Sequence, residues 1–217
     1  MNPVSRPRAI LFDWDNTLVD SWATLHQALN IAMTAMGKPQ WSLADTRRQM
    51  RLSLRDSFPQ HFGERWEEAR QIYLDAYGEI HLERLAALPG RAELLAGLAA
   101  TGIYLGIVSN KTGAVLRIEA ERLGWLPLLG SVVGAGDAPA DKPHAAPVRL
   151  ALAPSGIAAG EPVWFVGDTE LDMECAINSG CLPVLLGAEA APDEFARFPP
   201  RLSFSEGEAL FRFVEGL

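Results

Sequence analysis

Short apolar runs alternate with helical patterns over most of the chain. The runs are apolar on both faces, which is typical of strands buried on both sides of a sheet. The helical patterns between them end beside glycines, the residue that most readily adopts the left-handed conformation that closes a helix. The predicted strands are Ala9–Phe12, Ile103–Val108, Ser131–Val133, Val163–Val166 and Pro183–Leu186, and the helices span 91–100, 114–123 and 172–179. This alternation predicts an α/β fold with a doubly wound parallel sheet covered by helices on both faces.

A block of amphipathic helix interrupts the alternation after the first strand. Helical patterns cover Ser21–Met36 and Arg65–Leu85, and Ser42 is a predicted N-cap between them. Pro89 and Gly90 then mark the return to alternating strands and helices. The block carries no convincing strand pattern, so we expect it to form a separate helical part.

These boundaries divide the chain into a core and an insertion. Residues 1–20 and 89–217 are expected to form a Rossmann-like core, and residues 21–88 are expected to form a helical cap inserted as a lid over a site. The core is expected to end in a helix from about residue 206 to 214. Ser205 and Glu208 have the spacing of a capping box at the start of that helix.

The composition narrows the class of protein. The 217 residues are 48% hydrophobic, enough for one sizeable core with a modest insertion, and the net charge is −8 with a pI near 5.0. Nucleic acids and anionic membranes need clustered Lys and Arg, so we expect neither as a partner. Cys175 and Cys181 lack zinc-site spacing and are expected to be reduced, packed thiols. With no signal-peptide core or membrane-length apolar run, we expect a cytoplasmic protein, a monomer or a homodimer.

Polar side chains follow the predicted strands at the point where each strand ends. In a parallel sheet these ends meet at one edge, and ligands bind there. A carboxylate at such a point is costly to desolvate unless a partner is present. The candidates are Asp13, Asp15 and Thr17 after the first strand, Ser109, Asn110 and Lys111 after the second, Lys142 after the third, and Asp168 and Asp172 after the fourth. The role of Lys111 is left open, and Asp172 has a second interpretation as an acid that favours a helix start.

Phosphoryl transfer from a monoester is the chemistry that uses such a set. Asp13, Asp168 and a backbone oxygen near Asp15 would supply the hard oxygen ligands that Mg²⁺ prefers. One carboxylate can then attack phosphorus as a nucleophile, and a second, two residues away, can protonate the leaving group. Polar groups beside the phosphate stabilise the charge that spreads over its oxygens. The predicted substrate ligands in the core are Thr17, Ser109, Asn110 and Lys142.

Four stretches of the chain resemble the four motifs of the haloacid dehalogenase-like hydrolase superfamily. The stretches are DWDNTLVDS from Asp13, VSNK from Val108, DKPHAAP from Asp141 and GDTELD from Gly167. Their order and spacing match over nearly the whole chain, and the insertion resembles the small cap of the family. The most similar subgroup is the phosphoglycolate phosphatase-like hydrolases, although His144 and Ala146 stand where relatives often have prolines.

The resemblance implies an activity and a role for each polar residue. The activity is Mg²⁺-dependent hydrolysis of a small phosphorylated metabolite through an aspartyl-phosphate intermediate, which makes the protein a phosphoric monoester hydrolase. The implied roles are nucleophile for Asp13, general acid and base for Asp15, phosphate ligands for Ser109 and Lys142, metal ligand for Asp168 and supporting carboxylate for Asp172.

Other activities use a similar core. Dehalogenases have no acid two residues after the nucleophile, so Asp15 argues against one, and a phosphonatase needs a cap lysine, whereas Lys38 lies in a predicted turn. A phosphohexomutase shares the core motifs and stays open as an alternative. From a different class, a non-catalytic phosphate-binding or signalling module is the alternative, although a receiver domain would carry its acceptor aspartate in mid-chain.

Four arginines lie close together in the predicted cap, namely Arg47, Arg48, Arg51 and Arg55. Arginines four residues apart share one face of a helix. Arg51 is predicted to bind a second anionic group of the substrate, because its guanidinium suits the carboxylate of a phosphorylated acid such as phosphoglycolate. The alternative is a solvated basic face.

Overall fold

Six parallel strands form one sheet in the computed structural model, which describes residues 4–50, 52–187 and 194–217. Their order across the sheet is β3-β2-β1-β4-β5-β6, so the chain winds outward from the middle in both directions. The strands are β1 (Ala9–Phe12), β2 (Tyr104–Thr112), β3 (Ser131–Ala135), β4 (Val163–Gly167), β5 (Leu182–Leu186) and β6 (Leu202–Phe204). This order is that of a Rossmann-like doubly wound fold, and the predicted fold class is confirmed.

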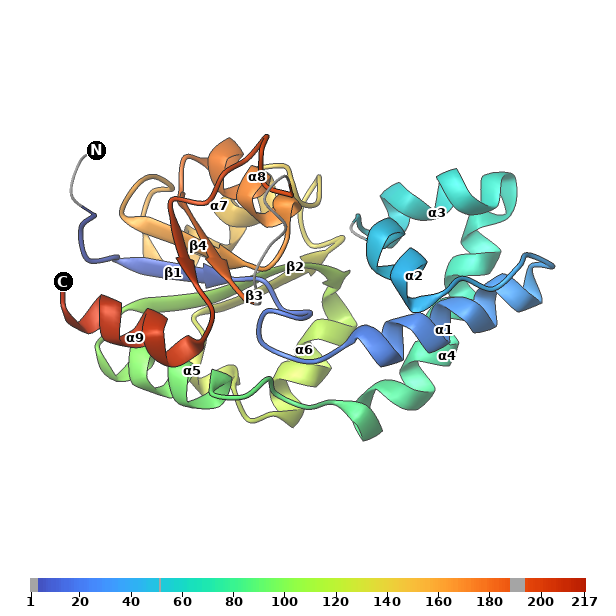
Figure 1. Ribbon diagram of the computed structural model, residues 1–217, viewed down its shortest axis with the longest axis horizontal. Helices are drawn as coiled ribbons and strands as arrows, with labels where there is room; N and C mark the ends of the chain where they lie inside the picture. The colour runs from blue at the N-terminus through green and yellow to red at the C-terminus, as the bar shows by residue number, and fades with distance from the viewer. Residues whose placement is uncertain (1–3, 51, 188–193) are drawn as a thin grey trace. The chain divides into compact units, whose positions relative to one another are not determined.

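Helices cover both faces of the sheet (Figure 1). One face carries α7 (Ala146–Leu152) and α8 (Glu170–Ser179), and the other carries α5 (Arg91–Ala100), α6 (Gly113–Arg122) and α9 (Gly207–Glu215). Two short 3₁₀ helices, η2 (Leu126–Leu128) and η3 (Ala153–Ser155), complete this part of the chain. All four side chains of β1 are fully buried because the strand lies between the two helical layers.

The alternation of side chains along β1 divides the core between the two layers. Ala9 and Leu11 belong to one buried cluster with Val148 of α7 and Ala176 of α8. Ile10 and Phe12 point to the opposite face, because successive side chains of a strand alternate. A strand that is apolar at every position is therefore what this central place in the sheet requires.

The chain divides into two compact units. The core unit comprises residues 1–19 and 87–217 and contains the sheet, whereas the helical unit comprises residues 20–86. The helices of the second unit are α1 (Trp22–Ala35), α2 (Leu43–Gln49), α3 (Leu54–Phe62) and α4 (Trp66–Arg84), with the 3₁₀ helix η1 (Gly63–Arg65) before α4.

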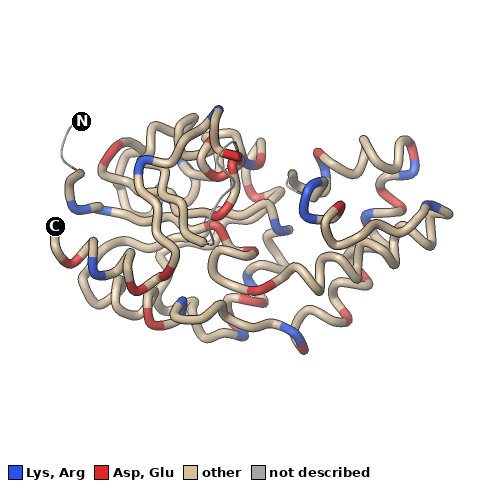
Figure 2. Tube along the Cα trace, in the orientation of Figure 1, with Lys and Arg blue, Asp and Glu red and all other residues tan. Residues whose placement is uncertain are grey.

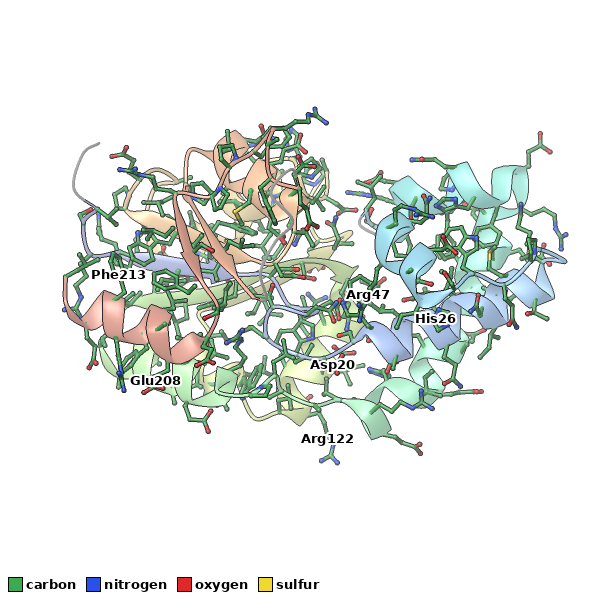
Figure 3. The ribbon with its side chains drawn as sticks, in the orientation of Figure 1. Asp20, His26, Arg47, Arg122, Glu208 and Phe213 are labelled. Atoms are coloured by element: carbon green, nitrogen blue, oxygen red, sulfur yellow. The ribbon has the colours of Figure 1, made fainter. Side chains whose placement is uncertain are left out.

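Polar and aromatic contacts join the helices of the helical unit. His26 of α1 meets Thr46 of α2 with 2.9 Å between Nδ1 and Oγ1 (Figure 3). Ser42 caps α2 as predicted, because its hydroxyl accepts a hydrogen bond from the amide of Asp45. Arg47, in a basic stretch at the end of α2 (Figure 2), lies 5.5 Å from the ring of Trp22. Thus at least one arginine of the predicted cluster stacks on a ring within its own unit.

The helix ends follow the sequence with one exception. Gly102, Gly124 and Gly180 have positive φ angles of 79°, 72° and 73°, as expected of glycines that close helices. The capping box predicted for the last helix is wrong, because α9 begins after Glu206 and has no side-chain cap, which leaves Ser205 outside the N-cap position. The three-residue strand β6 was also not expected, because it is too short to carry a periodic signal.

Cys175 and Cys181 are free thiols buried in the core unit. Over the described ranges, no helix combines the length and the apolar character needed to cross a membrane.

Candidate active site

The carboxyl ends of β1 and β4 meet where the winding direction of the sheet reverses. Phe12 pairs with Val166 in register, and the amide of Asp13 donates a hydrogen bond to the carbonyl of Val166 over 2.8 Å. Asp13, the first residue after β1, therefore lies beside the end of β4, and Asp168 is the first residue after β4. Open α/β sheets bind ligands at this kind of switch point.

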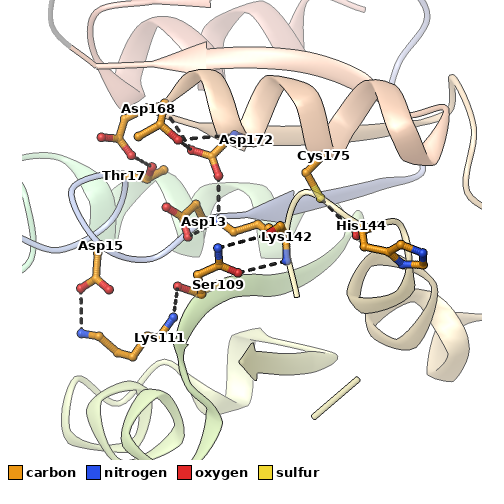
Figure 4. A network of polar contacts seen from close by, with 12 residues as sticks. Asp13, Asp15, Thr17, Ser109, Lys111, Lys142, His144, Asp168, Asp172 and Cys175 are labelled. Atoms are coloured by element: carbon orange, nitrogen blue, oxygen red, sulfur yellow. Dashed lines mark hydrogen bonds and ion pairs between the residues drawn. The ribbon is translucent and has the colours of Figure 1, made fainter. Parts of the chain in front are cut away.

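Lys142 connects two carboxylates at this point (Figure 4). Its ammonium lies 2.7 Å from Oδ1 of Asp13 and 2.7 Å from Oδ1 of Asp172. Burial opposes the charged form of Lys142, but the two carboxylates outweigh this effect, so the pKa of Lys142 is raised. The side chain is therefore a fixed positive charge, with only 2% of its surface exposed.

The carboxylates at the site carry more negative charge than Lys142 neutralises. Burial raises the pKa of Asp13 to about 6, against the lowering effect of Lys142. Burial also raises the pKa of Asp168 well above its ordinary value, and the charges of Asp172 and Asp13 add to this shift. Raised pKa values on neighbouring acids indicate a site that favours a bound cation.

The same acids offer ligand atoms at suitable spacing for a metal. Carboxylate oxygens of Asp13, Asp168 and Asp172 all lie within 4.8 Å of one another. Thr17 donates its hydroxyl to Oδ1 of Asp168 over 2.8 Å, which orients that carboxylate. Hard oxygen ligands in this arrangement fit Mg²⁺. The hydroxyl of Thr17 thus contacts a carboxylate in this structure. The predicted contact of Thr17 with substrate stays a prediction.

Asp172 joins the site to the start of α8. Its Oδ2 accepts hydrogen bonds from the amide of Thr169 over 3.0 Å and from the hydroxyl of Thr169 over 2.6 Å, while its Oδ1 faces Lys142. Asp172 therefore takes part in the capping box of α8 and also pairs with Lys142, and its supporting role in catalysis stays a prediction. The close approach requires glycine at position 167, where a Cβ would lie 2.3 Å from the Cβ of Asp172.

The end of β2 holds the loop that carries Lys142. Oδ1 of Asn110 accepts from the amide of Lys142 over 3.0 Å, and Nδ2 of Asn110 donates to the carbonyl of Lys142 over 3.2 Å. Ser109 is buried beside them, and its hydroxyl accepts from the amide of Lys111 over 3.2 Å. Ser109 and Asn110 thus lie at the site, and their contacts with substrate stay predictions.

Asp15 belongs to a second polar network, which the sequence did not predict. Its Oδ1 lies 2.7 Å from the ammonium of Lys111, which lies 2.6 Å from Oε2 of Glu119. The same oxygen of Glu119 accepts a hydrogen bond from Nε1 of Trp14 over 2.6 Å. Burial opposes the charge of Lys111, but Asp15 and Glu119 outweigh it, and the pKa of Lys111 is raised.

Two signals in the sequence point to features that the prediction missed. Glu119 lies three residues after Leu116 and one before Ala120, on the buried face of α6, where an acid needs a partner. Asn16 follows Asp15 with a φ of 63°, and Asn is the type that tolerates this left-handed conformation in a turn. Arg51, the predicted ligand for a second anionic group, lies outside the described residues.

Comparison with known proteins gives consistent matches in sequence. Residues 10–185 match the family described as haloacid dehalogenase-like hydrolase. The chain is 31% identical over 208 residues to a phosphoglycolate phosphatase of Shigella dysenteriae serotype 1, which covers 83% of this chain and 81% of the relative. It is 31% identical over 182 residues to a phosphoglycolate phosphatase of Xanthomonas campestris, covering 80% of each protein.

Solved structures match over almost the whole length. A hydrolase of the same superfamily from Ehrlichia chaffeensis has a TM-score of 0.66 and 30% sequence identity, with 99% of each chain covered. A haloacid dehalogenase-like hydrolase from Streptococcus pneumoniae has a TM-score of 0.83 and 24% identity, with 96% of this chain and 98% of that chain covered. The second similarity shows the fold alone.

Proposed function

Because this chain belongs to the haloacid dehalogenase-like hydrolases and is an enzyme of the phosphatase type, we propose that it hydrolyses a small phosphate monoester through an aspartyl-phosphate on Asp13. The observation that carries this proposal is the position of Asp13. Its buried carboxylate lies at the switch point of the sheet, 2.7 Å from the ammonium of Lys142 and within reach of the same cation as Asp168. A nucleophile, a positive charge and a cation site are the parts that phosphoryl transfer needs.

The donor set fits Mg²⁺ as the cofactor. Asp13 and Asp168 would hold the ion together with a backbone oxygen near Asp15, because carboxylate and carbonyl oxygens are the ligands it prefers. When bound, the ion offsets the repulsion between a carboxylate nucleophile and a phosphate dianion. Asp172 would support the site through Lys142, to which it is paired.

In the first step, an oxygen of Asp13 attacks phosphorus. A bond forms between Asp13 and phosphorus while the bond to the leaving oxygen breaks, and Asp15 gives its proton to that oxygen. Lys142 and Ser109 bind the phosphate oxygens as charge spreads over them. Lys142 suits this role because its raised pKa keeps it protonated throughout.

In the second step, water releases the phosphate. Asp15, now a carboxylate, takes a proton from a water molecule whose oxygen attacks phosphorus. The bond between Asp13 and phosphorus breaks, which frees the carboxylate of Asp13 and inorganic phosphate. The side chain of Asp15 is partly exposed, with 18% of its surface accessible, so that water can reach it.

The substrate we propose is phosphoglycolate or a related small phosphorylated acid. This class is supported by the similarity to phosphoglycolate phosphatases of Shigella dysenteriae and Xanthomonas campestris. The groups of the core unit act on the phosphate, which all monoesters share, so we assign substrate selection to the helical unit as a cap. Arg51 stays the predicted ligand for the substrate carboxylate.

A turnover screen tests the proposal. Phosphate release would be measured over a panel of monoesters with Mg²⁺, with Asp13→Asn as the blank and excess EDTA as the second control. We expect release by the unsubstituted enzyme alone, and only with the cation present. Full turnover by Asp13→Asn or in EDTA would contradict the mechanism, and isomerised sugar phosphate without phosphate release would identify a phosphohexomutase instead.

A further inference from the structure

Asp15 is part of a closed ring of contacts. The ammonium of Lys111 bridges Oδ1 of Asp15 and Oε2 of Glu119, at 2.7 and 2.6 Å, and Glu119 accepts the indole N–H of Trp14 at 2.6 Å. Trp14 is the neighbour of Asp15 in the chain, so the peptide between them completes the ring. We call these four residues the Asp15 network. The roles assigned above use Asp15 itself but none of the other three members.

Each member of the Asp15 network is held by a different part of the core unit. Trp14 is fully buried at the end of β1, and its ring meets that of Trp125 edge-on with 5.5 Å between the ring centres. Glu119 lies fully buried within α6. Lys111 lies in β2 where the pairing with β3 shifts register, an irregularity that can redirect a side chain. The network therefore ties Asp15 to β2 and α6 as well as to the end of its own strand, β1.

The charges of the network explain why it contains two acids. A buried lysine with one counter-ion is left uncompensated whenever that partner becomes neutral, which is costly. Asp15 is such a partner, because its proposed role is to carry a proton to the leaving group. Glu119 keeps Lys111 paired whether Asp15 is protonated or ionised, so the ammonium keeps a counter-ion and its position throughout the reaction. The contacts of Lys111 with both acids leave it poorly suited to bind a substrate anion.

We propose that Lys111 is a positioning residue for Asp15, and that Glu119, itself bonded to Trp14, holds Lys111 in place. Lys111 fixes Oδ1 of the carboxylate and so holds the side chain in one orientation for proton exchange with the leaving group. The inference rests on the proposed function, because it assigns proton transfer to Asp15. It does not depend on the identity of the substrate.

The dependence on leaving group tests the inference. Alkyl phosphates need their leaving oxygen protonated, whereas p-nitrophenyl phosphate releases a stable anion and needs this far less. Lys111→Met should lower kcat/KM for an alkyl phosphate at least about tenfold and change kcat/KM for p-nitrophenyl phosphate less than about threefold. Glu119→Gln should act in the same direction. Glu121→Gln, an exposed substitution on the same helix, is the matched control and should change neither. Equal losses on both esters would show that Lys111 is only structural and overturn the inference.

Two further measurements keep the test decisive. If Lys111→Met fails to fold because Glu119 is left charged, the double variant Lys111→Met/Glu119→Gln removes both charges and should show the same selective loss. A crystal structure of the folded variant gives a readout that needs no activity, and the carboxylate of Asp15 should leave the position it has in the unsubstituted protein. An unmoved carboxylate overturns the inference. If the unsubstituted enzyme shows no turnover that depends on Asp13, the proposed function fails while this structural test still decides the role of Lys111.

Discussion

Asp13 and Asp172 share the ammonium of Lys142 at the ends of β1 and β4, and Asp168 adds a third acid to the same cluster. This excess of acids over one ammonium governs the behaviour of single residues at the site. Two of these acids were predicted to bind the metal because they follow strands that meet at one edge. The pairing of Lys111 with Glu119 could not be predicted in the same way. The two residues are eight positions apart, and their contact depends on how α6 lies against β2.

Binding of Mg²⁺ should depend on pH through Asp13. Its folded pKa of about 6 exceeds the ordinary value of 3.8, so without metal the folded protein loses stability as pH rises through this window. Mg²⁺ needs the deprotonated carboxylate, so its stabilising effect should grow over the same window. Thermal unfolding with and without Mg²⁺ measures this effect. The range from pH 5 to pH 8 suits the experiment because it brackets the pKa of Asp13 at about 6. Asp168→Asn should weaken it, and an increase in Tm that does not vary with pH would contradict the assignment.

Lys142→Met should affect both stability and catalysis. The substitution leaves two buried carboxylates without their counter-ion, so the free energy of unfolding in EDTA should fall by about 3 kcal/mol. The loss of a charged group at the phosphate should also lower kcat/KM, by an amount that corresponds to about 2–4 kcal/mol of lost transition-state stabilisation. Denaturant unfolding and steady-state kinetics measure the two effects. The exposed Lys38→Met is the control, within about 0.5 kcal/mol of the unsubstituted protein. Unchanged kinetics for Lys142→Met would remove Lys142 from the site.

At the scale of elements, periodicity and glycines predicted most strands and helices, because buried strands and capped helices leave local signals. The helices α3 and α7 were not predicted. Two other differences have local causes. The strand β2 extends to Thr112 because polar residues continue it into the site, where an apolar run no longer marks it. The start of α9 was misplaced by one residue because the spacing of Ser205 and Glu208 does not ensure that their side chains form a cap.

Gly167 tests how closely β4 and α8 must approach. Gly167→Ala places a Cβ 2.3 Å from the Cβ of Asp172, so the start of α8 must shift. We expect a loss of roughly 1–3 kcal/mol in the free energy of unfolding, together with a large fall in kcat. The matched control is Gly78→Ala in α4, where an added Cβ meets nothing within 4 Å. This substitution should stabilise the helix by up to about 1 kcal/mol, because alanine favours a helix more than glycine does. Equal unfolding free energies for the two variants in denaturant would contradict the contact.

At the scale of the whole molecule, the alternation of strands and helices predicted the doubly wound core, and the lack of strand patterns predicted the helical insertion. The chain leaves the core unit at Val19 and returns at Ala87, and these two residues form an antiparallel bridge. The amide of Leu88 also donates to the carbonyl of Leu18 over 2.9 Å. Because its two ends already meet, the core unit should not need the insertion in order to fold.

Replacement of residues 20–86 by a short glycine linker tests this expectation. The shortened chain should show the circular dichroism of an α/β protein and unfold in one cooperative transition. The closed loop costs little entropy, because the linker joins residues that are already adjacent. An unfolded product would show that the helical unit is part of the folding core.

The most direct test of the central claim is to locate the phosphoryl group on the enzyme. Asp15→Asn removes the group that activates water, so the intermediate formed from a substrate with a good leaving group should accumulate. After acid quenching, peptide mass spectrometry would identify the residue that carries the added phosphate. The account predicts phosphate on Asp13 in Asp15→Asn and none in Asp13→Asn. Phosphate on another residue, or turnover without any labelled intermediate, would contradict it.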